Sequence, residues 1–314
     1  MTITPEILKK FFLIFDKKIS INEEKKFFEG KKIQNEEKKS YFDKNFFNEK
    51  NKFFHQKNTG KFEEFDVKKF FSNGLQKNFY SQKFLKKFFK YQKIFAFCPF
   101  VKGIFIGNTI AFGSANEKSD IDLFIVFDNG KIWTGRFFLT ILLHIFGLRR
   151  HGKKIAGRFC LSFFTSEKGS FNLEKIQISE KDFSENEKKI FEKVKKYKNF
   201  DIYLAIWTAT LIPVFGEKKF FKDFFEQNKW IKDFGIKHIY TGFPPSQDGQ
   251  NKIKIIFETI LNFNFIENFL RKIGKKRAEK KKKNIKNNFG IIISDDFLKF
   301  HNEDLRVKIL DELF

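Results

Sequence analysis

Two aspartates stand two residues apart in the segment GNTIAFGSANEKSDIDLFIV, residues 107–126. Successive side chains of a β-strand point to opposite faces, so Asp120 and Asp122 are predicted to share one face, with Ile121 and Leu123 on the other. Two carboxylates held this close repel each other unless a positive charge lies between them. A divalent cation such as Mg²⁺ would relieve that repulsion, because it prefers hard oxygen ligands and keeps coordination positions open for phosphate oxygens. The alternative is that the two aspartates are only the polar side of an edge strand.

The loop before the aspartates has the features of a phosphate-binding turn. A short apolar strand, VKGIFIG (101–107), leads into Asn108 and Thr109 at the expected start of a helix. Free backbone N–H groups at a helix start bind phosphate oxygens, and the helix dipole strengthens that binding. A phosphate cradle beside a pair of metal ligands is the equipment of phosphoryl or nucleotidyl transfer.

These residues resemble the signature of the polymerase-beta-like nucleotidyltransferases. In that family a Gly-Ser pair opens a helix, another Gly follows five residues on, and a D-h-D motif lies in the next strand. Asn108 and Thr109 stand where the Gly-Ser pair would be, Gly113 matches the later Gly, and Asp120 and Asp122 match the metal-binding aspartates. The nearby Gly-Ser dipeptide that begins at Gly113 lies too close to the aspartates to be the signature pair.

The resemblance extends more loosely beyond residues 101–127. The stretches WTGRF (133–137), DIYLAIW, NKWIKDF and SDDFLKFH look like features of a bacterial subgroup of nucleotidyltransferase-domain proteins with helical flanks on both sides. The implied fold is α+β, a small mixed-sheet core flanked by helical modules.

The implied activity is transfer of a nucleoside monophosphate from a nucleoside triphosphate to an acceptor hydroxyl, with release of pyrophosphate. Asp120 and Asp122 would hold Mg²⁺ or Mn²⁺, and Thr109 keeps the hydroxyl that the family's Ser offers to a phosphate. Asn108 departs from the family's Gly, since a Cβ restricts close backbone approach, and Gly107 is expected to take over part of that role. Whether the acceptor is a protein, an RNA end or a small molecule stays open.

Arginine side chains are the expected partners of the triphosphate. Arg136 lies on the helix after the aspartate strand, and a guanidinium binds phosphate oxygens in a bidentate manner. Arg149, Arg150 and His151 follow that helix. They are either a positive cap on its C-terminal dipole or further ligands of the nucleotide.

A third carboxylate is missing from the place where the family usually has one. The strand RFCLSFF (158–164) contains no Asp or Glu, and Ser162 stands at the expected position. Asp128 and Glu167, close to strand ends, are the candidate substitutes. Loss of a general base costs roughly 10²–10⁴-fold in rate. The competing hypothesis is therefore a catalytically degenerate module that binds nucleotide, nucleic acid or a protein partner without chemistry.

The hydrophobic patterning divides the chain into three parts. Residues 1–77 are predicted to form a small helical module, with a winged helix as one option, and residues 78–180 the nucleotidyltransferase core. Residues 181–314 are predicted to be a helical region with a basic linker at 271–288. The elements expected in detail are helices at 79–97, 132–147, 201–215 and 220–234, and strands at 101–107, 119–127 and 158–164.

The composition bounds the class of protein without identifying a ligand. The chain has 314 residues, 50 of them Phe, and a formal net charge of +24. Phe, Lys, Asn and Ile all have AT-rich codons, so codon bias explains much of this excess. The run 271–288, with ten Lys or Arg in eighteen residues, is either a nucleic-acid-contacting arm or a solvated linker.

The remaining signals favour a cytoplasmic protein without a membrane partner. Cys98 and Cys160 are too few for a disulfide framework or a metal cluster, and the N-terminal residues lack the pattern of a signal peptide. The apolar stretch 132–148 is at the short limit for a bilayer span and is predicted to be a buried helix. Its His144 is predicted to be a core or interface histidine, and Ser294 in the SDD sequence is predicted to cap a helix.

Overall fold

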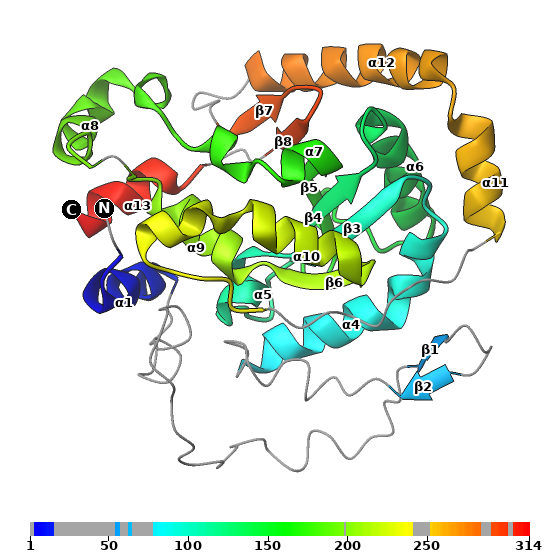
Figure 1. The fold of residues 1–314 in the computed structure, drawn as a ribbon, viewed down its shortest axis with the longest axis horizontal. Helices are drawn as coiled ribbons and strands as arrows, with labels where there is room; N and C mark the ends of the chain where they lie inside the picture. The colour runs from blue at the N-terminus through cyan, green and yellow to red at the C-terminus, as the bar shows by residue number, and fades with distance from the viewer. Residues whose placement is uncertain are drawn as a thin grey trace.

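A six-stranded mixed sheet forms the centre of the molecule (Figure 1). The computed structural model describes residues 3–15, 54–56, 62–64, 78–197, 199–240, 252–283, 290–300 and 304–314. The strand order is β6-β3-β4-β5-β8-β7, in which β4 and β5 are parallel and all other neighbours are antiparallel. The strands are β3 (Val101–Ile106), β4 (Ile121–Phe127), β5 (Phe159–Ser166), β6 (Ile212–Gly216), β7 (Ile291–Ile293) and β8 (Phe297–Phe300). The predicted α+β class with a mixed sheet is confirmed.

Helices surround this sheet, and a separate two-stranded ribbon, β1 (Phe54–Gln56) with β2 (Phe62–Glu64), does not join it. The α-helices are α1 (Pro5–Ile14), α4 (Phe79–Ala96), α5 (Asn108–Phe112), α6 (Ile132–Ile145), α7 (Glu167–Ser170), α8 (Lys188–Val194), α9 (Ile202–Thr210), α10 (Lys218–Gln227), α11 (Lys252–Leu261), α12 (Asn264–Lys283) and α13 (Arg306–Leu313). Short 3₁₀ segments lie at Leu173–Ile176, Glu180–Asp182, Glu185–Glu187 and Lys229–Phe234.

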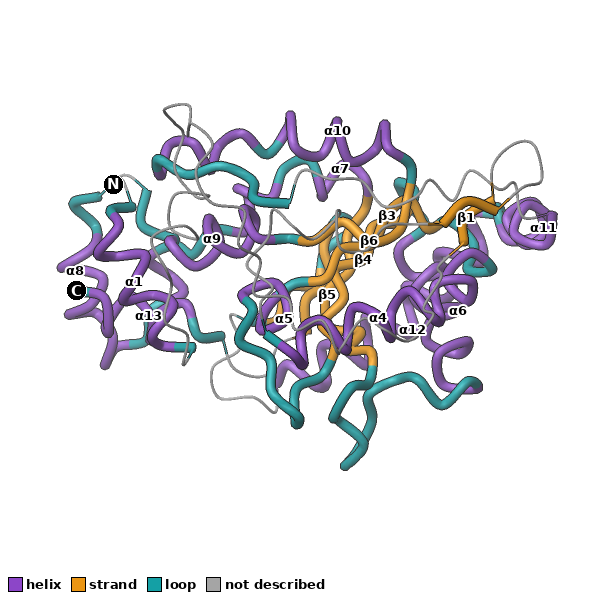
Figure 2. Tube along the Cα trace, turned by 90° about the horizontal axis from the view of Figure 1, so that it is seen from below, coloured by secondary structure: helices purple, strands orange, loops and turns teal. Residues whose placement is uncertain are grey.

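Helices lie on both faces of the sheet (Figure 2), and aromatic side chains form much of the core between the sheet and these helices. On one face Phe105 packs against Phe221 and Phe224 of α10, at ring-centroid distances of 5.1 and 4.4 Å. On the other face Phe159 contacts Phe95 of α4 at 5.4 Å. Many of the Phe residues therefore do the ordinary work of a hydrophobic core, filling space between a sheet and the helices on its two sides.

The predicted order of strand, helix-bearing loop, strand, helix and strand is confirmed by β3, α5, β4, α6 and β5. The start of α6 has no cap from its own segment, since Lys131 at the N-cap makes no side-chain capping bond. The Glu267 carboxylate of α12 instead accepts hydrogen bonds from the backbone N–H groups of Trp133 and Thr134, at 3.0 and 2.8 Å, and from the Thr134 hydroxyl. A carboxylate at this position also complements the helix dipole, so α12 is fastened to the first turn of α6.

The C-terminal region differs from the predicted all-helical one, because three of its strands extend the central sheet. The single helix expected at 201–215 ends at Thr210, and Ile212–Gly216 form the edge strand β6, which pairs with β3. Pro213 lacks the N–H that a helix needs, whereas an edge strand tolerates that loss. The residues from 218 to 234 form α10 followed by a 3₁₀ segment, close to the predicted helix at 220–234.

Two further predictions in this region are corrected. The basic run is helical as far as Lys283, at the end of α12, so this part is no linker; residues 284–288 lie outside the described ones. Ser294 caps no helix. It closes the β7–β8 turn, where its hydroxyl accepts a hydrogen bond from the backbone N–H of Phe297 at 2.9 Å. Asp295 pairs with Arg271 at 3.2 Å on the surface.

The N-terminal module is described only in part. Helix α1 buries Leu8, Phe11 and Phe12. Most of residues 1–77, including the apolar residues near 67–71, lie outside the described residues, so the helical or winged-helix hypothesis and the domain boundaries stay predictions. Across the described ranges, no helix is both long and apolar enough to cross a bilayer.

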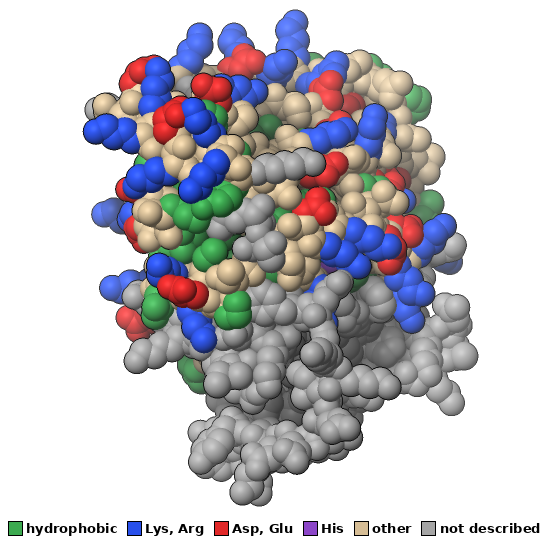
Figure 3. All heavy atoms as spheres, turned by 60° about the vertical axis from the view of Figure 1, so that its left-hand side comes forward, with side chains coloured by type: hydrophobic (Ala, Val, Ile, Leu, Met, Phe, Trp, Pro, Cys, Tyr) green, Lys and Arg blue, Asp and Glu red, His purple; other side chains and the backbone are tan. Residues whose placement is uncertain are grey.

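Basic and acidic side chains are mixed on one side of the molecular surface. Figure 3 shows one side of the molecule, on which Lys and Arg side chains alternate with Asp and Glu. Such mixing is expected where a compositional bias scatters Lys along the chain, and it makes any cleft lined by one sign of charge more informative.

Candidate functional site

The two aspartates lie together at the beginning of β4. Asp120 immediately precedes the strand and Asp122 is its second residue. The parallel register with β5 places Asp122 opposite Cys160. One ligand atom from each of Asp120, Asp122 and Cys160 lies within 4.8 Å of the others. The predicted proximity of the two carboxylates is confirmed, and Cys160 is the third group that could hold a metal ion with them.

The loop after β3 positions Asp122 from the other side. Gly107 is the N-cap of α5, and Asn108 has a positive φ of 53°, a left-handed conformation that Asn tolerates better than most residues. The Asn108 amide donates a hydrogen bond to the Asp122 carboxylate at 2.9 Å, and the Tyr203 hydroxyl donates to the Asn108 amide oxygen at 3.2 Å. Asn108 therefore has a structural reason to replace Gly here, because its side chain orients one of the two aspartates.

Gly113 ends α5 with a φ of 68°. This left-handed C-cap lets the chain turn out of a five-residue helix and run toward Asp120. Gly113 thus shapes the loop without lining the cavity at its start, which is lined by Gly107, Asn108 and Thr109.

Arg150 forms an ion pair with Asp120. One guanidinium nitrogen, Nη1, lies 2.6 Å from a carboxylate oxygen of Asp120 and 3.6 Å from the Cys160 sulfur. The backbone N–H of Arg150 donates to the carbonyl of Phe159, so the segment after α6 runs beside the start of β5. Arg150 is thus a partner of the aspartate pair, a role that was not among the two predicted for this cluster. Its neighbour Arg149 makes no ion pair within the described residues.

The electrostatics of the site disfavour two free carboxylates. Burial, and next the negative charge of Asp120, raise the pKa of Asp122 to about 6, although the Asn108 amide and Arg150 act in the opposite direction. Burial, followed by the charges of Asp122 and Asp120, raises the pKa of the Cys160 thiol, so the thiol is protonated at neutral pH. A cation bound between these groups would offset the repulsion that, after burial, contributes to raising both pKa values.

The third potential metal ligand at this site is a thiol and not a carboxylate. Among the described residues, the cluster of potential metal ligands at this site contains no acid beyond Asp120 and Asp122. Asp128 follows the last residue of β4, at the opposite end of the strand, where it pairs with Lys102 at 3.2 Å. Glu167 follows the end of β5 in the same way. Neither residue can therefore act as a third ligand beside Asp120 and Asp122. Cys160 was not predicted, because the family resemblance calls for an acid on this strand.

A cavity of about 200 Å³ opens beside Asp122. Its walls are the start of α5, the first residues of β4, the middle of β5, helix α9 and the segment from β8 to α13. It is lined by Phe15, Gly107, Asn108, Thr109, Asp122, Leu123, Phe124, Ser162, Phe163, Ile176, Tyr203, Leu204, Trp207, Lys299, Asp304, Leu305 and Arg306. Aromatic side chains thus form much of the wall, and a carboxylate from the aspartate pair lies at the rim.

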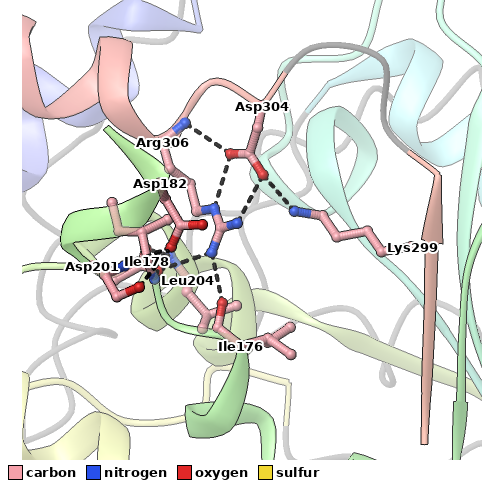
Figure 4. Close-up of polar contacts among 9 residues, drawn as sticks. Ile176, Ile178, Asp182, Asp201, Leu204, Lys299, Asp304 and Arg306 are labelled. Atoms are coloured by element: carbon pink, nitrogen blue, oxygen red, sulfur yellow. Dashed lines mark hydrogen bonds and ion pairs between the residues drawn. The ribbon is translucent and has the colours of Figure 1, made fainter. Parts of the chain in front are cut away.

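A buried network of charged side chains supports one wall of this cavity (Figure 4). The Asp304 carboxylate accepts from Lys299 at 2.6 Å and from the Arg306 Nε at 2.8 Å, while Arg306 also reaches Asp201 at 3.1 Å. Burial opposes ionisation of Asp304, yet the charges of Lys299 and Arg306 hold its pKa well below the usual range. Two cations face two anions, so the network is neutral and fixes the position of α13 against β8.

Arg136 does not join the residues at the start of α5. It lies in a second, larger cleft of about 1160 Å³ between α6 and α12, together with Arg149, Arg150 and Arg277. Ser162 lines both this cleft and the smaller cavity beside Asp122. His144, predicted to be a core or interface histidine, is exposed and therefore does not lie in the core; its ring centre lies 5.3 Å from that of His151.

Comparison with known protein families, curated proteins and solved structures found no significant match for this chain.

Proposed function

We propose that this protein is a nucleotidyltransferase with a polymerase-beta-like core, which moves a nucleoside monophosphate from a nucleoside triphosphate to an acceptor hydroxyl. The observation that carries the proposal is the pairing of Asp120 with Asp122, which lines the same cavity as Gly107, Asn108 and Thr109. The chain order β3-α5-β4-α6-β5, with the aspartates at the start of the second strand, is the arrangement that the signature requires.

The donor set fits a divalent cation. Asp120 and Asp122 offer hard oxygen ligands suited to Mg²⁺ or Mn²⁺, and the Cys160 sulfur favours the softer of these two ions. When bound, such an ion supplies Lewis-acid stabilisation of negative charge on phosphate oxygens. Such an ion would compete with the Arg150 guanidinium, whose Nη1 lies 2.6 Å from Asp120 and 3.6 Å from the Cys160 sulfur.

The chain's own residues have separate tasks in this proposal. Asn108 holds Asp122 in place, and Thr109 lines the cavity next to it, where a triphosphate would lie. The acceptor oxygen forms a bond to the α-phosphorus as the bond to the β-phosphate oxygen breaks. Pyrophosphate leaves, and the acceptor's proton passes to water. Nothing in the described part of the chain offers a third carboxylate as base, so we expect slow turnover.

A second candidate function is supported by one specific observation. The Arg150–Asp120 ion pair and the thiol at Cys160 stand where a fully equipped enzyme would have a free aspartate and a third acid. A module with these features binds nucleotide, nucleic acid or a protein partner without transferring anything. The two hypotheses differ in whether label from a nucleotide reaches an acceptor.

The test is incubation of the full chain with each of the four α-labelled nucleoside triphosphates and Mg²⁺ or Mn²⁺, with total RNA and a cell lysate as acceptors. Transfer by the wild type and its loss in Asp122→Asn establish the enzyme and identify its nucleotide. Absence of transfer in every combination, together with Mg²⁺-dependent nucleotide binding, establishes the binding module instead.

Installing the missing acid gives a sharper test of the same site. We expect Cys160→Asp to raise Mg²⁺-dependent transfer by up to about 10²–10⁴-fold, the contribution of a general base, because Cys160 lies opposite Asp122 on the parallel strand. The rate with Mn²⁺ should rise less, since the thiol already suits the softer ion. The matched control is Cys160→Ser, which removes the sulfur without adding charge and should show no such gain. Equal rates for the Asp and Ser variants would contradict the role given to this position.

A further inference from the structure

The cleft between α6 and α12 is a built cavity with one sign of charge. It is lined by Trp133, Arg136, Phe137, Thr140, Ile141, Arg149, Arg150, His151, Gly152, Cys160, Leu161, Ser162, Phe269, Leu270, Ile273, Gly274, Arg277, Ala278 and Phe300. Four of these residues are arginines and none is an acid. At Gly274 a Cβ would lie 2.3 Å from the Trp133 ring, so this ring packs directly on the backbone of α12. The two helices that line the cleft are thus joined by this contact and by the hydrogen bonds of Glu267.

Arg136 is the strongest sign of an anionic ligand. Its guanidinium carbon lies 4.5, 5.5 and 5.7 Å from the ring centres of Phe300, Phe164 and Trp133. Among the described residues no carboxylate pairs with Arg136. Burial, and next the charge of Arg149, lower the pKa of Arg136 to about 10. A largely buried cation without a counter-charge is costly, and such a cost is typical of a site that an anion completes.

The size and charge of the cleft indicate which kind of anionic ligand it would bind. Its volume of about 1160 Å³ exceeds what a single phosphate group needs. Four arginines in one lining match a chain of repeated phosphates better than a small molecule with a single phosphate.

Exposed aromatic rings lie beside the arginines. The side chains of Phe137 on α6 and Phe269 on α12 both line the cleft and are 44% and 62% exposed. Basic grooves with accessible aromatic rings are typical of single-strand binding, because phosphates contact the cations while unpaired bases stack on the rings. The basic run alone lacks such rings, and the tertiary structure supplies them from α6 and from the first turns of α12.

The cleft adjoins the aspartate pair. Arg150 lines the cleft and also pairs with Asp120 at 2.6 Å, and Cys160 lines the cleft while belonging to the cluster of potential metal ligands. A nucleic-acid strand whose backbone contacts Arg136 and Arg149 would therefore reach Asp120 by way of Arg150.

We propose that the α6–α12 cleft binds single-stranded nucleic acid and directs the strand's terminal ribose hydroxyl to the aspartate pair as the acceptor. This inference rests on the proposed nucleotidyl transfer for the role of the hydroxyl, but not for the binding itself. A phosphodiester contacts Arg136 and Arg149, Arg277 contacts the next phosphates, and Phe137 and Phe269 stack on bases.

The test measures binding without catalysis. Fluorescence anisotropy is recorded with labelled single-stranded RNA and DNA of about 12 nucleotides, in chelator and without nucleotide, at several salt concentrations. We expect Arg136→Gln and Arg277→Gln each to weaken binding about tenfold or more and to lower the salt slope by about 0.7 per lost phosphate contact. The matched control is Lys275→Gln, which removes the same charge from α12 outside the cleft lining and should change affinity less than about threefold.

Several results would overturn the inference. Equal losses in Arg277→Gln and Lys275→Gln would show binding by diffuse charge, and tighter binding to phosphatidylserine vesicles than to either strand would assign the cleft to a membrane surface. Arg149→Gln replaces Arg136→Gln if the latter fails to fold by circular dichroism. Asp122→Asn separates the two proposals: retained binding of the single-stranded nucleic acid together with lost nucleotidyl transfer supports both. Transfer to another acceptor without strand binding refutes this inference alone, and strand binding without transfer in the wild type refutes the proposed function alone.

Discussion

Asp122→Asn is expected to abolish metal-dependent nucleotide binding and transfer while making the protein more stable. Asp122 is held by the Asn108 amide, beside Asp120 and Cys160, and its pKa is raised to about 6 from an ordinary value of 3.8. Above pH 6 the folded protein therefore carries a carboxylate charge at Asp122, and the free-energy cost of this charge is lower in the unfolded chain. An amide of the same shape removes that charge and can still accept the hydrogen bond from Asn108.

The expected gain in stability depends on pH in a defined direction. A pKa raised by about two units corresponds to about 1–3 kcal/mol in the free energy of unfolding, allowing for partial exposure. The wild type lacks this stability above pH 6 and regains it as the pH falls from 6 toward 3.8, because the folded state then takes up a proton at Asp122. The advantage of the variant should accordingly be largest at pH 8 and vanish near pH 4.

The measurement is urea unfolding of both proteins in chelator across this range, with Mg²⁺-dependent nucleotide binding measured in parallel. Asp128→Asn is the matched control, because Asp128 lies at the other end of β4 and pairs with Lys102. This variant should change neither the Mg²⁺ dependence of nucleotide binding nor the pH dependence of the free energy of unfolding. Loss of stability in Asp122→Asn at pH 8, or unchanged metal-linked nucleotide affinity, would contradict the metal-site interpretation.

Asp304→Asn is expected to cause the largest loss of stability. The Asp304 side chain is 3% exposed and lies between Lys299 and Arg306, so its removal leaves two buried cations facing only Asp201 (Figure 4). Breaking a buried ion pair by removing one partner typically costs about 3–5 kcal/mol. Because the pKa of Asp304 is held below its ordinary value, the wild type retains this contribution above pH 4 and loses it as the pH falls further.

Thermal and urea unfolding at pH 7 test this prediction. Asp311→Asn, at an exposed position on the same helix α13, removes an identical charge and should alter the free energy of unfolding by less than about 0.5 kcal/mol. We also expect the Asp304 variant to weaken nucleotide binding, since Lys299, Asp304 and Arg306 line the cavity beside Asp122. A variant as stable as the wild type would show that the network is not needed to place α13.

The local elements around the aspartates were predictable because their signals are contained in short segments. Apolar runs of strand length alternate with a helical pattern from residue 101 to 166, and β3, β4, α6 and β5 follow that order. The two-residue spacing of Asp120 and Asp122 is enough to place their side chains on one face of a strand. The helical charge and apolar pattern of 79–97 likewise predicted α4 almost to the residue.

Other elements depended on partners far away in the chain. The apolar run that contains Pro213 satisfies a helical and a strand pattern equally well, and pairing with β3 decides for a strand in its second half. The β7–β8 hairpin has strands of only three and four residues, too short to show a clear alternation in the sequence. Its place at the edge of the sheet follows from contacts with β5, about 130 residues earlier.

The sequence by itself thus determined the aspartate pair and the strands and helices beside it, because strand alternation and helical periodicity act over a few residues. Only the tertiary structure decided that Cys160 is the third group, that Arg150 neutralises Asp120, and that Arg136 faces a cleft made with α12. The register between parallel strands and the packing of α12 on α6 bring these groups together. Both depend on side chains that are distant in sequence, so no local pattern records them.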